Sequence, residues 1–176
     1  MSMKKAKHQV DRTLEAVLIT LMAADVVTVL WQVFTRFILR DPSSFTEELA
    51  RFLLIWVGLL GAGYAAGQKL HLAVDVVFQS LSPRRRHQAG LLIQTLVFLF
   101  ALAVMVIGGI RLVSVTLRLH QISAALRVKL GYVYLVLPLS GLLLMFYAAV
   151  FFREHIRALR GRPVEMKPER VRVFPD

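Results

Sequence analysis

Four stretches of the chain carry almost no charge, and they are the feature that most limits how the chain can fold. They span residues 16–35, 52–68, 88–110 and 131–152, and Asp25 is the only charged residue within them. A helix needs about 20 apolar residues to cross the hydrocarbon core of a bilayer, and only helices and closed barrels satisfy their backbone hydrogen bonds there. The runs are too long and too uniformly apolar for barrel strands. The sequence therefore predicts an all-α integral membrane bundle of four transmembrane helices.

The composition also favours a membrane protein over a soluble one. Hydrophobic residues make up 57% of the 176 residues and charged residues 19%, against roughly 45–50% and about 25% in soluble domains. The chain has no cysteine, so we expect neither a disulfide framework nor a thiolate metal site. The first apolar run is long for the core of a signal peptide, and no typical cleavage site follows it. We therefore interpret this run as a retained membrane helix.

Turn and capping residues between the runs predict where each helix begins and ends. We expect membrane helices over residues 11–39, 44–67, 83–119 and 131–152, and a short amphipathic interfacial helix over residues 70–81. Ser44 and Glu47 fit the capping-box pattern at the start of the second helix, and Pro138 should kink the fourth. The flanking segments, residues 1–10 and 153–176, are basic, and we expect them on the cytoplasmic side of the membrane.

The formal net charge of +11 reflects how positive residues are distributed around the helices. Most of the 22 lysines and arginines fall in the N-terminal segment, in the connection between the second and third helices, and in the C-terminal tail. Cytoplasmic loops are enriched in Lys and Arg, so both termini are predicted to lie inside. Arg84, Arg85 and Arg86 would lie at headgroup level, where basic residues attract anionic phospholipids at about 1 kcal/mol each. A nucleic-acid partner is not expected.

Asp25 is the candidate intramembrane acid. A carboxylate at the centre of a membrane helix is costly, so its side chain should face protein or water. It would serve either as a proton or sodium site, or as a polar contact with Thr20, Thr28 or a residue of a partner chain. One carboxylate offers few oxygen ligands for a cation, which favours the second interpretation.

No histidine lies in an apolar run, so a haem between the helices would lack axial ligands. His71 and Asp75 lie one turn apart on the predicted interfacial helix, and they could form a hydrogen bond or, less readily, an acid–base or metal site. The sequence holds no nucleophile constellation and no phosphate-binding loop. We therefore predict no catalytic residue, no cofactor and no metal, which argues against a membrane enzyme or redox subunit.

Small residues recur on the second helix at spacings that let another helix approach closely. Gly58, Ala62 and Ala66 share one face, and Gly63 and Gly67 share a neighbouring one. We interpret both faces as helix-packing surfaces.

Charged residues gather where the first two helices meet the outer side of the membrane. Exposed ion pairs would contribute little there, whereas partly buried ones could orient a partner. We predict a partner interface at this rim, extended by the outer loop over residues 121–129. Its candidate residues are Arg36, Arg40, Glu47, Glu48, Arg51, Gln121 and Arg127.

Several of these segments resemble one known family. They are residues 31–37 (WQVFTRF), 42–51 (PSSFTEELAR), 56–64 (WVGLLGAGY), 71–75 (HLAVD), 121–126 (QISAAL) and 134–141 (YLVLPLSG). In this order and spacing they are similar to the small membrane subunit of tripartite ATP-independent periplasmic (TRAP) transporters, the DctQ-like family. The resemblance covers roughly residues 11–152.

The resemblance implies a multi-pass protein of the bacterial inner membrane that takes part in sodium-driven uptake of organic acids. It implies two partners, a large DctM-like membrane subunit that moves as an elevator and a periplasmic DctP-like substrate-binding protein. The small subunit would brace the large one without carrying a substrate site. Two alternatives stay open: a self-sufficient ion-coupled carrier that uses Asp25, and the small subunit of a tripartite tricarboxylate transporter.

Overall fold

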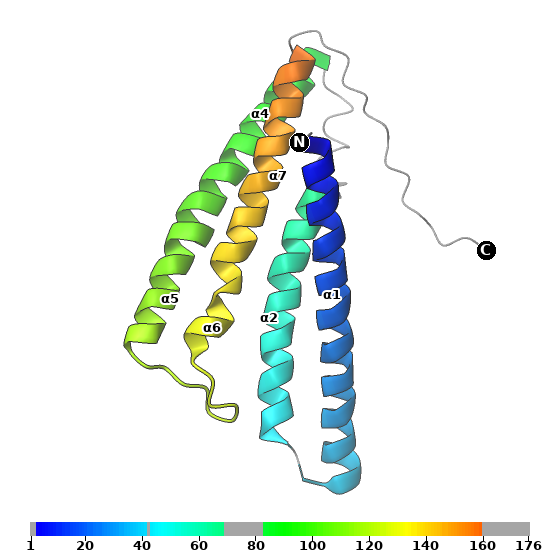
Figure 1. Ribbon diagram of the computed structural model, residues 1–176, viewed down its shortest axis with the longest axis vertical. Helices are drawn as coiled ribbons and strands as arrows, with labels where there is room; N and C mark the ends of the chain where they lie inside the picture. The colour runs from blue at the N-terminus through cyan, green and yellow to red at the C-terminus, as the bar shows by residue number, and fades with distance from the viewer. Residues whose placement is uncertain (1–2, 42, 69–82, 160–176) are drawn as a thin grey trace, which may run out of the picture.

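The computed structural model describes residues 3–41, 43–68 and 83–159, and these are almost entirely helical. In the described part there is no strand, only an isolated antiparallel bridge between Ile122 and Lys129. Four helical spans are long and apolar enough to cross a membrane (Figure 1). The elements are α1 (Met3–Phe34), η1 (Thr35–Leu39), α2 (Ser44–Gly67), α4 (Pro83–Phe100), η2 (Ala101–Gly108), α5 (Gly109–Arg118), α6 (Leu130–Tyr134) and α7 (Val136–Leu159).

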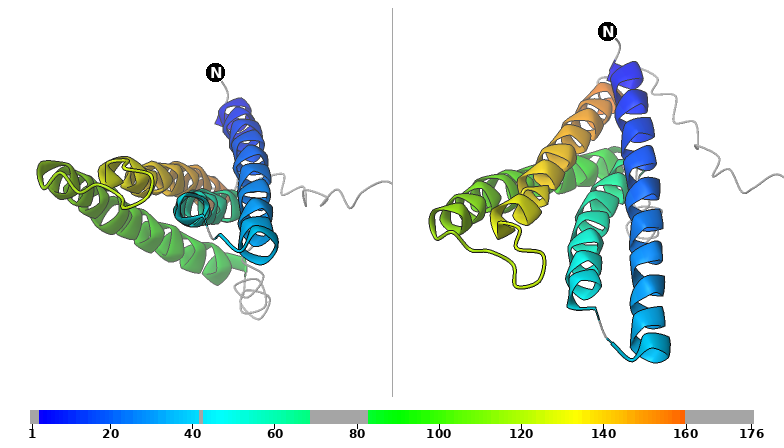
Figure 2. Two further views of the ribbon diagram at one scale, coloured as in Figure 1. Left: turned by 90° about the horizontal axis from the view of Figure 1, so that it is seen from below. Right: turned by 60° about the horizontal axis from the view of Figure 1, so that its bottom comes forward.

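The helices form two antiparallel pairs that share α7 as their common support. The first pair is α1 with α2, and the second is the continuous rod α4–η2–α5 with α6 and α7. Helix α7 packs against both α2 and α4. The pairs converge at the end where α1 begins and α7 ends, here called the terminal end. They spread apart toward the opposite end, the loop end (Figures 1 and 2).

At the terminal end, a contact between Gly67 and Tyr147 brings α2 and α7 together. A Cβ atom on Gly67 would lie 2.5 Å from Cζ of Tyr147, so only glycine leaves room for the ring. Tyr147 is 1% exposed, and its hydroxyl donates a 2.6 Å hydrogen bond to Oδ1 of Asp11 on α1. Lys7 lies 3.0 Å from the other oxygen of that carboxylate. Three helices are thereby joined at one point.

Two segments depart from the regular α-helical hydrogen-bond pattern. The π-helical segment η1 ends α1, and the backbone N–H groups of Arg40 and Asp41 both donate to the Thr35 carbonyl. Arg40 closes this turn with a left-handed φ of 54°. The second π-helical segment, η2, lies within the third membrane span and leaves the rod continuous. The first helix starts at Met3, which is earlier than the expected residue 11.

The N-cap of α2 differs by one residue from the predicted capping box. Ser43, not Ser44, has the extended N-cap backbone, and its Oγ accepts a 3.5 Å hydrogen bond from the Thr46 N–H. Thr46 Oγ1 returns a 3.0 Å bond to the Ser43 carbonyl. The capping box was predicted one residue too late, because either of the two adjacent serines could serve as the N-cap. The Glu47 carboxylate accepts a hydrogen bond from Arg51 and does not cap the helix.

The fourth span is interrupted at Leu135, between α6 and α7. Pro138 has no N–H to donate to the carbonyl of Tyr134, so the regular ladder cannot continue through this turn. The Leu135 N–H bonds instead to the Tyr132 carbonyl at 3.3 Å. Gly109 of α5 accommodates the proline, because a Cβ there would lie 2.9 Å from Cδ of Pro138.

Replacement of Gly67 by alanine tests the terminal-end contact. Gly67→Ala should destabilise the protein by about 1–3 kcal/mol, because the added methyl overlaps a ring that cannot move away. Gly58→Ala is the matched control, since a Cβ at Gly58 has no neighbour within 4 Å. Thermal unfolding of both variants in the same detergent is the measurement. Equal melting temperatures for the two variants would contradict the proposed contact.

Candidate partner interface at the loop end

The loop between α5 and α6 has its own hydrogen-bonded structure. The Ser123 N–H donates to the Val128 carbonyl at 2.9 Å, and the Leu130 N–H donates to the Gln121 carbonyl at 3.0 Å. The Ser123 hydroxyl accepts a 3.3 Å bond from the Val128 N–H. Arg127 takes a left-handed φ of 53°, which lets the chain reverse direction within a few residues. These bonds give the loop a defined shape between the two helices.

Glu48 of α2 holds the tip of this loop. Its Oε2 accepts hydrogen bonds from the backbone N–H groups of Ala125 and Leu126, each at 2.8 Å. A carboxylate that receives two backbone donors forms strong, charge-assisted bonds. The loop is therefore fastened to the neighbouring helix pair by an internal contact. Glu48, predicted from the sequence to lie at a partner interface, makes this contact within the chain.

Trp56 makes a second link between the same two parts of the structure. Its indole Nε1–H donates a 3.1 Å hydrogen bond to the Val133 carbonyl of α6. Glu48 and Trp56 are eight positions apart on α2, so they lie close to one helical face. Closer to the terminal end, Leu60 packs with Val136 and Leu14 in a buried cluster. One face of α2 thus contacts the loop, α6 and α7 in turn.

The other charged residues predicted at the rim do not form one cluster. Glu47 and Arg51 make an exposed ion pair at 3.4 Å, with side chains 61% and 66% exposed, and such a pair stabilises little. Arg36 and Arg40 are exposed on η1 and at its end. Within the described residues neither of them forms an ion pair. The structure therefore separates Glu48 from the four other residues of the predicted cluster.

The exposed side of the loop is basic. Residues 109–135 contain no Asp or Glu. Among the described residues, the carboxylate that reaches the loop is that of Glu48, and backbone amides hold it. Exposed apolar side chains lie between the basic ones, with Ile122 56% and Val128 39% exposed. We call this the basic loop surface, and it consists of Arg118, Gln121, Ile122, Arg127, Val128 and Lys129.

The two small-residue faces of α2 have different environments. Gly63 and Gly67 are buried against α7, and a Cβ atom on Gly63 would lie 3.7 Å from Cβ of Leu143. Ala66 is half-buried, whereas Gly58 and Ala62 are exposed. The face that contains Gly63 and Gly67 therefore packs inside this chain, and most of the other face remains uncovered by the described residues.

Asp25 is half-buried in α1 and has one unsatisfied atom. Its Oδ1 is buried, and no described residue donates a hydrogen bond to it. The hydroxyls of Thr20 and Thr28 donate instead to the backbone carbonyls of Ala16 and Ala24. Contact with either threonine was one of the expected alternatives, and it does not form because each hydroxyl is bonded within its own helix.

The remaining candidate residues lie at the terminal end or beyond the described part. Arg84, Arg85 and Arg86 lie in the first turn of α4. His71 and Asp75 fall outside the described residues. Among residues 3–41, 43–68 and 83–159, no three His, Cys, Asp or Glu side chains come together as a metal site would require.

The profile of one protein family matches most of the chain. Residues 25–158 match the family described as "Tripartite ATP-independent periplasmic transporters, DctQ component". The chain belongs to this family. The match includes Glu48, Trp56 and the whole loop between α5 and α6.

Individual relatives agree with the family match. The chain is 30% identical over 108 residues to the sialic acid TRAP transporter small permease protein SiaQ of Vibrio cholerae, covering 61% of this chain and 62% of that one. It is 25% identical over 139 residues to a putative TRAP transporter small permease protein of Haemophilus influenzae, covering 79% and 82%. A second such protein of that organism is 32% identical, and the chain spans only half of its length.

The chain also matches part of a longer permease. It is 34% identical over 95 residues to the isethionate TRAP transporter permease protein DctMQ of Oleidesulfovibrio alaskensis. The match covers 54% of this chain and 15% of that protein. A DctQ-like segment is therefore found within a larger polypeptide.

Replacement of Glu48 tests whether its carboxylate holds the loop. Glu48→Ala should speed amide hydrogen exchange at Ala125 and Leu126 by about tenfold or more, the factor expected when a hydrogen bond to a charged group is lost. Glu47→Ala is the control, because it removes only the exposed pair with Arg51. Exchange followed by mass spectrometry of peptides covering residues 119–130 gives the comparison. Unchanged exchange in the Glu48 variant would show that the loop keeps its shape without this contact.

Proposed function

We propose that this chain is the small, non-catalytic membrane subunit of a sodium-driven TRAP transporter for organic acids. It braces a large DctM-like membrane subunit and helps dock a periplasmic DctP-like substrate-binding protein. In this proposal the chain lies in the bacterial inner membrane with both termini in the cytoplasm. The basic loop surface, fastened to α2 by Glu48, is the observation that carries the docking part of the proposal.

The bracing part rests on how the buried polar groups are used. Most buried hydroxyls bond to backbone carbonyls three or four residues earlier in the same helix, as Thr35, Thr116 and Ser140 do. Such groups are already satisfied and cannot assemble a site for a charged solute. Long apolar side chains cover the outer faces of α1 and η2, and these faces suit lipid or a second membrane protein. The sequence match to the longer DctMQ protein supports a permanent membrane partner.

The proposed orientation is supported by the charge of the terminal end. The terminal end carries the basic N-terminal residues and the three arginines at the start of α4. The enrichment of positive residues in cytoplasmic segments supports placing this end inside. The loop end then faces the periplasm, where a substrate-binding protein would meet the basic loop surface. Electrostatic attraction of this kind raises the rate of association.

The alternative of a self-sufficient carrier has one observation in its favour. Asp25 keeps a buried oxygen without a hydrogen-bond partner among the described residues, and polar groups inside a membrane often mark ion pathways. The alternative of a tripartite tricarboxylate subunit is not retained, because the matching family is the DctQ component of TRAP transporters.

Charge reversal on the loop tests the docking proposal. Arg127→Glu combined with Lys129→Glu should weaken uptake at low binding-protein concentration, because it replaces attraction of an acidic partner by repulsion. Substrate uptake into proteoliposomes that contain both membrane subunits is measured while the concentration of substrate-bound binding protein is varied. The concentration of binding protein that gives half-maximal uptake should rise by about tenfold. The maximal uptake rate should stay within about twofold, because the substitutions weaken docking and not the transport step.

Arg36→Glu with Arg40→Glu is the comparison variant, because it reverses two exposed charges of the predicted rim that lie away from the loop. An equal rise in the half-saturating concentration for both variants would show that the charge of the whole rim, and not the loop surface, attracts the binding protein. A binding-protein titration that is identical in the wild type and the loop variant would refute docking at this surface. Co-purification of the large subunit, measured on the same samples, shows whether either variant disturbs the membrane complex itself.

Replacement of Asp25 distinguishes the brace from the carrier. Asp25→Asn keeps the shape of the side chain and removes its charge, so a bracing subunit should keep at least about half of its uptake rate in the full complex. Sodium-driven uptake by this chain alone, abolished by Asp25→Asn, would instead establish the carrier alternative. Thr28→Asn, about one turn away on the same helix, controls for a general effect on α1.

A further inference from the structure

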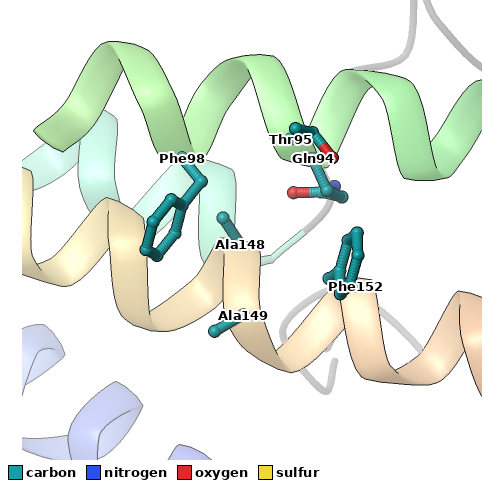
Figure 3. Close-up of a pocket in the computed structure, with 6 residues that line it drawn as sticks. All are labelled: Gln94, Thr95, Phe98, Ala148, Ala149 and Phe152. Carbon is teal, nitrogen blue, oxygen red and sulfur yellow. The ribbon is translucent and has the colours of Figure 1, made fainter. Parts of the chain in front are cut away.

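An apolar crevice lies between α4 and α7 in the half of the bundle nearer the terminal end. It holds about 240 Å³ of space and is lined by Gln94, Thr95, Phe98, Ala148, Ala149 and Phe152. Figure 3 shows the rings of Phe98 and Phe152 at opposite ends of the crevice, with one ring coming from each helix. Because the lining side chains are mostly apolar, the crevice suits a hydrocarbon chain.

Gln94 and Thr95 are the two polar residues in this lining. The Gln94 amide lies in the space between the two helices, near the Phe152 ring (Figure 3). None of the described residues forms a hydrogen bond with it, whereas the neighbouring Thr95 hydroxyl donates to the Leu91 carbonyl at 2.8 Å. An amide inside a membrane span has a substantial cost unless it is hydrogen-bonded. The crevice therefore offers two N–H donors to a ligand that carries carbonyl oxygens.

The depth of Gln94 matches the level of lipid ester groups. By length and composition, the candidate span that contains α4 begins at Gln88. With Gln88 placed at the outer edge of the bilayer, Gln94 lies about 9 Å deeper along the helix. The polar layer of a bilayer is about 5–8 Å thick on each side. A phospholipid whose ester carbonyls reach Gln94 would therefore place its phosphate near the ends of α4 and α7.

Charge at these helix ends favours an anionic headgroup. Helix α4 begins with Arg84, Arg85 and Arg86, and the last turn of α7 contains Arg157. Neither of these turns contains an acidic residue. Basic pockets between membrane helices on the cytoplasmic side are known to bind anionic lipid headgroups.

We propose that the crevice between α4 and α7 is a binding site for one anionic phospholipid. An acyl chain lies between Phe98 and Phe152 against Ala148, an ester carbonyl accepts a hydrogen bond from Gln94, and the phosphate lies at the basic helix ends. The bound lipid fills the contact between the two helices and stabilises it. The site does not depend on which substrate a transporter complex would carry.

The test uses the full-length protein purified in detergent, to which phosphatidylglycerol or phosphatidylcholine with identical acyl chains is added. Phosphatidylglycerol should raise the melting temperature and stay bound in native mass spectra at one molecule per chain. Phosphatidylcholine should be retained less. Gln94→Leu removes the amide, and should weaken retention about fivefold, the factor for one net hydrogen bond. Gln94→Trp fills the crevice and should abolish retention.

Leu92→Trp is the matched control, because Leu92 is 62% exposed on the same helix and does not line the crevice. It adds an indole at a similar depth and should retain phosphatidylglycerol like the wild type. Equal retention by all variants, or equal stabilisation by both lipids, would overturn the proposal. A parallel co-purification with the proposed large membrane subunit covers the other occupant. Loss of that subunit on Gln94→Trp, with lipid retention by the chain alone unchanged, would overturn the proposal and show that a protein partner fills the crevice.

Discussion

The contact of α7 with both of its neighbours is the constraint on which the rest of the structure depends. Its tightest point is the Tyr147 ring against Gly67, where a single methyl group would be too large. The same ring reaches Asp11 through its hydroxyl, so α1, α2 and α7 meet at one buried side chain. In a membrane, lipid is as apolar as the helix surfaces, and association depends on close packing and hydrogen bonds of this kind.

At the opposite end the helix pairs diverge, and polar contacts take over from packing. The Glu48 carboxylate holds the loop tip and the Trp56 indole holds α6. Both contacts are made to backbone groups of the α5–α6 loop and of α6. They therefore depend on the backbone conformation of this segment more than on the identity of its side chains. The loop can therefore present a basic outer surface while its inner side is fixed to α2.

The sequence was sufficient for the helical class and for the family, because twenty-residue apolar runs and ordered motifs are local properties. It did not reveal Glu48 as an internal contact, since the partners are backbone amides of Ala125 and Leu126, whose availability depends on the folded loop. The Asp11–Tyr147 hydrogen bond was missed for a similar reason. The two residues are 136 positions apart in the chain, and neither belongs to a sequence motif that would predict a partner. The sequence placed Gly58 and Gly67 on two neighbouring faces and predicted helix packing at both. Only the position of α7 shows which of the two faces packs inside the chain.

The length of α1 has a consequence for anything that approaches from the loop side. From Asp11 to Leu39 the first helix rises about 43 Å, while α2 returns over about 36 Å from Gly67 to Ser44. Because both are fixed together at the terminal end, η1 projects beyond the start of α2 (Figure 1). The surface at the loop end is therefore stepped: η1 projects, and the loop between α5 and α6 is set back from it. A rigid, flat partner would contact η1 first, so a partner reaches the loop from the α5–α6 side.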